Sequence, residues 1–126
     1  MNGFLLAAGV VATATALIHL IAGHFDPVRP LLSSSMAEVP KRTLHGAWHM
    51  ASVTMALAAA VLLYLAFAGG DRETELLARF IALQYLVYGL VFLVLALSIR
   101  QPNRLLRLPQ WTMLFPVAVL AWWGTV

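Results

Sequence analysis

Four histidines are the residues of this chain whose type and spacing could do chemistry. They all fall within residues 19–49, at His19, His24, His45 and His49. On a helix, residues four apart share one face, so His45 and His49 are expected to lie one turn from each other. Because neutral imidazole is a common ligand of zinc, copper and iron, the pattern predicts a site for one transition-metal ion.

Two acidic residues between the histidine pairs could complete this site. Asp26 or Glu38 would supply an oxygen ligand or hold an imidazole N–H. An open ligand position would permit metal-dependent redox or hydrolytic chemistry, whereas a fully ligated ion would be structural or stored. Metal handling is a further role of such a site. Haem b, ligated by His19 and His49 from facing helices, is the alternative cofactor. Enzymatic and non-enzymatic roles both fit the pattern.

Long apolar runs must position these residues. Of the 126 residues, 62% are hydrophobic and 10% are charged, and the mean hydropathy is +0.87. A membrane-spanning helix needs about 20 apolar residues. The sequence offers such runs at about 3–22, 44–68, 76–99 and 109–125. It therefore predicts a single-domain, all-α, integral membrane four-helix bundle of two antiparallel hairpins, with the lipid bilayer as its surroundings.

Helix-capping and helix-breaking residues suggest where the first helix ends and where the second begins. Gly23 and Asp26-Pro27 are expected to end the first helix, and Thr43 to begin the second. A short interfacial helix near Ser35 is expected in the long loop between them. With the hairpin tip near Ser33, all four imidazoles would lie at one depth. Stripes of small residues, among them Ala8, Ala12, Thr15, Ser52, Ala56 and Ala59, would bring the two helices together.

The basic residues predict an orientation. They lie mainly in the first and third connections, at Arg29, Lys41, Arg42, Arg100, Arg104 and Arg107. Short cytoplasmic loops are enriched in Lys and Arg, so these two loops are expected in the cytoplasm. The protein is then expected to cross the inner membrane several times, with both termini in the periplasm. The net charge of +3 then faces anionic lipid, and nucleic acid is not expected as a partner.

Missing motifs remove several enzyme classes. The chain has no cysteine, which excludes thiolate chemistry. It also lacks a nucleophile elbow and a phosphate-binding glycine loop, which removes support for serine hydrolases and NTPases. Two further roles fit a small apolar chain. One is a non-enzymatic accessory or assembly subunit of a homo-oligomer or larger membrane complex. The other is transport of a small solute or proton with the histidines as titrating groups.

Several short segments carry a resemblance to known proteins. They are Ile18–Gly23, Val28–Leu32, Leu44–His49 and Leu108–Trp111. Together they resemble a group of small uncharacterised bacterial four-helix inner-membrane proteins. The resemblance implies the fold and the inner-membrane location described above, and it implies no activity or residue role.

Overall fold

The computed structural model describes residues 1–126 and is all-helical. Helices account for 84% of the chain and there is no strand, which confirms the all-α class. In chain order the elements are α1 (Gly3–Gly23), the π-helix η1 (His24–Val28), α2 (Arg29–Ser33), α3 (Glu38–Ala68), α4 (Arg72–Ser98), α5 (Arg104–Arg107) and α6 (Trp111–Trp123).

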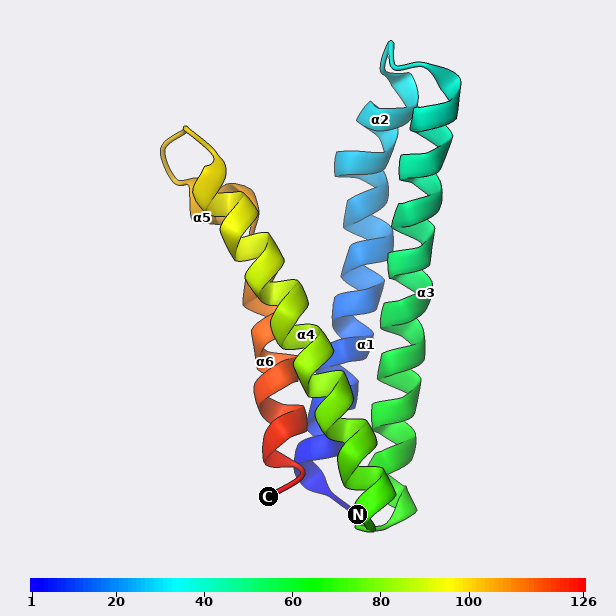
Figure 1. Ribbon diagram of the computed structural model, residues 1–126, viewed down its shortest axis with the longest axis vertical. Coiled ribbons are helices and arrows are strands. Elements are labelled where there is room, and N and C mark those ends of the chain that lie inside the picture. Colours follow the sequence, from blue (N-terminus) through cyan, green and yellow to red (C-terminus); the bar gives the residue numbers. More distant parts are fainter.

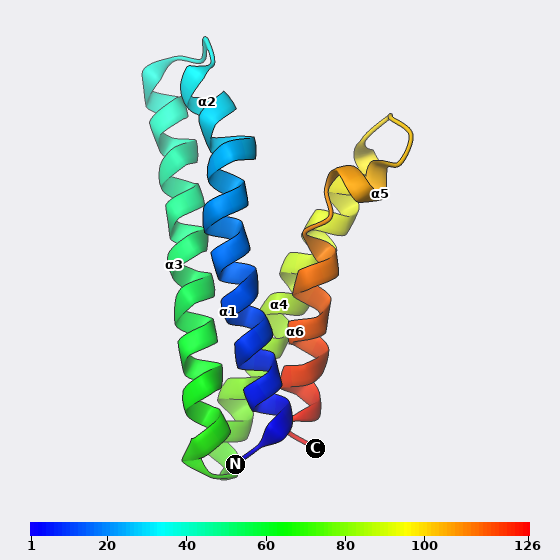
Figure 2. The same cartoon turned by 180° about the vertical axis from the view of Figure 1, so that it is seen from behind.

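The helices form two antiparallel hairpins that diverge. α1 packs along α3, and α4 packs along α6, while α1 also contacts α6 (Figure 1). Both views show the hairpins together near the two chain termini and apart at their other ends (Figure 2). We call the first region the closed end; it comprises residues 1–9, 62–79 and 122–126. The second region is the open end, comprising residues 19–49 and 97–111.

Three helical stretches are long and apolar enough to cross a membrane. They are Gly3–Ser33, Glu38–Ala68 and Arg72–Ser98. The fourth predicted span is shorter than expected, because α6 has 13 residues. At 1.5 Å per residue it is about 20 Å long, against a hydrocarbon core of about 30 Å. A fourth full crossing by this helix is therefore not confirmed.

α1 ends at Gly23, where the sequence predicted, but the chain stays helical beyond it. η1 and α2 follow without a break to Ser33, so the first half of the expected long loop is helical. Pro27 has no N–H to donate, and the chain accommodates it in one wider turn, in which the Arg29 N–H bonds the His24 carbonyl. The prediction of a short helix starting near Ser35 is also wrong. Residues 34–37 form the connection, and α3 begins earlier than predicted.

Small residues make the close contact between α1 and α3. Ala8, Ala12 and Thr15 are buried, as their stripe predicted. A Cβ added at Gly9 would come within 2.7 Å of the Leu63 side chain, so the two helices approach closely there. On α3, however, Ala56 is exposed. The buried face of α3 is instead made by residues three or four positions apart. They are Ser52, Met55, Ala59, Leu62 and Ala66.

Asn2 ties the closed end together. Its side-chain oxygen accepts from the backbone N–H groups of Phe4 and Leu5, which caps α1. Its backbone N–H donates to the Ala66 carbonyl at 2.8 Å, and its Nδ2 donates to the Gly124 carbonyl at 2.7 Å. The last of these is the only hydrogen bond between the two hairpins.

Candidate functional site

His45 and His49 form a close pair on α3. Their Nε2 atoms are 3.1 Å apart, and their ring centroids are 4.6 Å apart. His45 is half-buried and His49 is exposed. The i,i+4 spacing on one helical face is therefore confirmed. The distance permits one Nε2–H to donate to the other nitrogen when both rings are neutral.

Trp48 lies between this pair and His19. The His19 ring stacks on the Trp48 indole with centroids 5.2 Å apart and planes 24° apart. The same indole meets His49 edge-on at 4.9 Å and lies 6.3 Å from His45. Three of the four histidines therefore share one aromatic neighbour, which the sequence reasoning did not include. The signal for it was the position of Trp48 three residues after His45 on the same helix.

The interface around Trp48 leaves two polar atoms without a partner. The Nε2 of His19 and the Nε1 of Trp48 are buried and make no hydrogen bond. α1 approaches the indole closely, since a Cβ at Gly23 would lie 3.1 Å from Trp48 Nε1. His19 thus faces α3, as its stripe predicted, and its ring stacks on the Trp48 indole.

The remaining candidate ligands lie apart from the pair. His24 is exposed in η1 and contacts Phe25 at 5.5 Å. Asp26 is exposed in the same element. Glu38 is occupied by Arg42, whose Nε lies 2.6 Å from its carboxylate. No three His, Asp or Glu side chains come close enough to one another to hold a single ion.

The four imidazoles do not converge, although the register of the hairpin is close to the expected one. The connection lies at residues 34–37, and Trp48, the neighbour of the expected partner His49, stacks on His19. Adjacent residues of a helix lie about 100° apart around its axis, so His19 meets the indole and not the imidazole of His49. The helix also continues past Gly23, which leaves His24 on a π-helical turn.

Haem does not fit this arrangement of the rings. Axial ligation by His19 and His49 would require the porphyrin to lie between them. Trp48 packs against both rings, at 5.2 and 4.9 Å. A porphyrin would therefore have to displace the indole and separate α1 from α3.

Comparison of this chain with family models, with curated proteins and with solved structures finds no match. The resemblance of its short segments to bacterial four-helix membrane proteins therefore stays a prediction. Any function has to be argued from the geometry above.

Proposed function

We propose that this chain is a membrane protein that binds one divalent transition-metal ion through His45 and His49. The supporting observation is the 3.1 Å separation of their Nε2 atoms. A tetrahedral zinc ion bonded to two imidazoles at about 2.0–2.1 Å holds their nitrogens about 3.3 Å apart. The distance between the two nitrogens is therefore within a few tenths of an ångström of that in a chelate, and α3 does not have to move.

The site is proposed to be open rather than closed. With two protein ligands, an ion keeps at least two positions for water, a partner or a substrate. Asp26 and Glu38 are not beside the pair, and His19 is separated from it by Trp48. Such a site holds an ion less firmly than a four-ligand structural site. Metal handling, in which an ion is accepted and passed on, is the role that we propose.

Metal titration of single-histidine variants tests this proposal. The purified protein, carrying an affinity tag without histidine, is titrated with Zn²⁺ by calorimetry and with Co²⁺ by visible absorption. We expect one ion per chain. His45→Ala and His49→Ala should each weaken binding by about tenfold or more, since loss of a ligand costs at least as much as loss of a second-shell partner.

His24→Ala is the matched control, because it removes an exposed histidine at the same end of the molecule. It should leave the affinity unchanged. Absence of stoichiometric binding by the unaltered protein would contradict the proposal, as would an equal loss in His24→Ala.

The divergence of the two hairpins favours a second candidate function, an accessory subunit of a larger membrane complex. α3 and α4 pack little against each other, and large apolar side chains are exposed on both. This role predicts that His45→Ala and His49→Ala leave assembly intact. Mass measurement of complexes gently extracted from native membranes distinguishes the two functions, because an accessory subunit should co-purify stoichiometrically with one defined partner.

A further inference from the structure

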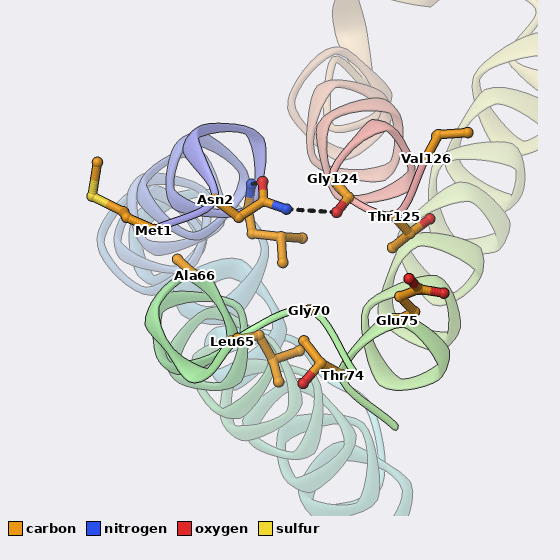
Figure 3. A pocket seen from close by; sticks show the side chains of 12 residues that line it. Met1, Asn2, Leu65, Ala66, Gly70, Thr74, Glu75, Gly124, Thr125 and Val126 are labelled. Atoms are coloured by element: carbon orange, nitrogen blue, oxygen red, sulfur yellow. Dashed lines mark hydrogen bonds between the residues drawn. The ribbon is translucent and has the colours of Figure 1, made fainter. Parts of the chain in front are cut away.

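A polar cavity lies at the closed end, where the two hairpins meet (Figure 3). Its volume is about 500 Å³, and it lies among the start of α1, the end of α3, the start of α4 and the residues that follow α6. Its polar side chains are those of Asn2, Thr74, Glu75 and Thr125. Glu75 is the only charged side chain among the lining residues, and its carboxylate accepts hydrogen bonds from hydroxyl or ammonium groups.

An apolar groove lies nearby, between α4 and α6. Its volume is about 320 Å³, and every residue that lines it is apolar. These residues are Ala82, Leu83, Leu86, Ala118, Val119, Trp122 and Trp123. In a membrane such a groove accommodates hydrocarbon, because nearly all of its surface is apolar.

Arg79 connects the cavity and the groove. Its Nε donates to the Thr125 hydroxyl at 3.1 Å, and one Nη donates to the Thr125 carbonyl at 3.0 Å. Thr125 lines the cavity. The guanidinium also lies over the Trp122 ring, 5.8 Å from its centroid, and Trp122 lines the groove. The other Nη makes no hydrogen bond within the protein, so it remains available to an acceptor.

Helical spacing puts Arg79 at the mouth of the groove. Ala82, Leu83 and Leu86 follow it by three, four and seven residues, so all four share one face of α4. Glu75 lies one turn nearer the helix start, with its carboxylate 3.8 Å from the Arg79 Nη2 atom. The order along α4 is therefore acid, base and apolar groove.

We propose that the cavity and the groove together bind one glycerophospholipid with an ammonium head group. Its phosphate would accept hydrogen bonds from Arg79, its ammonium would face Glu75 in the polar cavity, and one acyl chain would lie in the α4–α6 groove. The charge order supports this occupant. In such a lipid the phosphate is next to the glycerol and chains, and the ammonium lies beyond it.

The same order argues against a purely anionic lipid. Its phosphate would also meet Arg79, but its head group would bring no cation to Glu75. A lipid with a quaternary ammonium has the right charge but no N–H to donate to the carboxylate. We therefore expect phosphatidylethanolamine to bind more tightly than phosphatidylcholine or phosphatidylglycerol with identical chains.

Native mass spectrometry of the delipidated, detergent-purified protein tests the proposal with these three lipids. For the unaltered protein we expect one phosphatidylethanolamine per chain, retained about tenfold or more over the other two. Arg79→Gln should weaken retention of all three lipids by removing the phosphate contact. Glu75→Gln should remove the preference for phosphatidylethanolamine over both other lipids, because the carboxylate that pairs with the ammonium is lost. Leu83→Trp should weaken retention of all three lipids by filling the groove, with both charges kept.

Two matched controls neutralise exposed charges in the first turn of α4. Arg72→Gln and Glu73→Gln make the same chemical changes at residues that line neither the cavity nor the groove. Both should retain phosphatidylethanolamine like the unaltered protein. The proposal is overturned if Arg72→Gln loses as much lipid as Arg79→Gln, or if Glu75→Gln keeps the full preference. Circular dichroism of each variant establishes that it is folded, and Leu83→Trp provides the test if Arg79→Gln does not fold.

Discussion

The closed and open ends of the molecule are held together by different kinds of hydrogen bond. At the closed end the bonds join residues far apart in the chain, such as Asn2 to Gly124 and Arg79 to Thr125. At the open end they join near neighbours. Lys41 bonds the Ser34 carbonyl and Arg104 bonds the Leu97 carbonyl, each across seven residues.

In a membrane this difference would matter, because lipid supplies no hydrophobic drive between helices. Close packing and hydrogen bonds then decide which helices stay together. The closed end has both, with Gly124 so close to Leu5 that a Cβ there would come within 2.6 Å of the Leu5 side chain. The open end has neither between the hairpins. We infer that the hairpins are fixed relative to each other at one end only, and that the His45–His49 pair belongs to one hairpin.

The largest effect is expected from Gly9→Leu. An added Cβ would meet the Leu63 side chain at 2.7 Å and its backbone nitrogen at 3.0 Å, so α3 itself would have to move. Overpacking ordinarily costs about 1–3 kcal/mol, and the backbone contact places this change at the upper end or above. Unfolding of the purified protein by a denaturing detergent measures the loss. Stability equal to that of the unaltered protein would mean that α1 and α3 do not approach as described.

The next effect is expected from Asn2→Ala. The change removes the cap of α1, worth about 0.5–2 kcal/mol, and the bond to Gly124, worth about 0.5–1.5 kcal/mol. Asn2→Asp keeps the capping oxygen and loses only the Nδ2 donor, so it should be less destabilising.

The same variants test whether Asn2 holds the hairpins at a fixed separation. Because the chain has no cysteine, spin labels can be attached at Ser35→Cys and Gln101→Cys, near the tips of the two hairpins. Both Asn2→Ala and Asn2→Asp should broaden the distance distribution between the labels. An unchanged distribution would show that the single bond between the hairpins does not restrain them.

A smaller, opposite effect is expected from Gly46→Ala at the open end. Gly46 lies inside α3, and an added Cβ would have nothing within 4 Å. Alanine costs less backbone entropy than glycine in a helix, so the variant should gain about 0.5–1 kcal/mol. The contrast with Gly9→Leu distinguishes a face of α3 with open space from the face that packs on α1. A destabilised Gly46→Ala protein would argue that an unseen neighbour contacts this face.

The smallest effect is expected from the charge on Asp71 at the start of α4. The backbone N–H of Thr74 donates to this carboxylate at 2.8 Å, and with the Thr74 hydroxyl it lowers the pKa of Asp71. A carboxyl group whose pKa falls on folding stabilises the protein at pH values above its ordinary pKa of about 3.9. This stabilisation is lost as the pH drops through the lower folded pKa.

Asp71→Asn keeps the cap and removes the titration. The stability advantage of the unaltered protein over this variant should therefore shrink as the pH is lowered from about 4. Parallel stability profiles across that range would show that the Asp71 charge contributes nothing.

Part of the candidate site could be predicted from the sequence. The i,i+4 spacing of His45 and His49 fixes their approach, since helix geometry alone brings such residues together. The position of His19 in the interface followed from the small residues of its stripe. The partner of His19 did not follow, because the rotation of α3 about its own axis decides whether Trp48 or the adjacent His49 faces α1. Trp48 occupies that place, and the predicted four-histidine cluster is not assembled.

By itself, the sequence determined the helical class, the apolar stretches long enough for a membrane and the local histidine pair. These properties depend on composition and on the period of a helix. Tertiary structure alone decided the π-turn at Pro27, the shortness of α6, the stacking of His19 on Trp48 and the divergence of the hairpins. Each of these depends on which side chains meet across helices. Small residues let two helices approach closely in many registers, so the sequence pattern does not select one register.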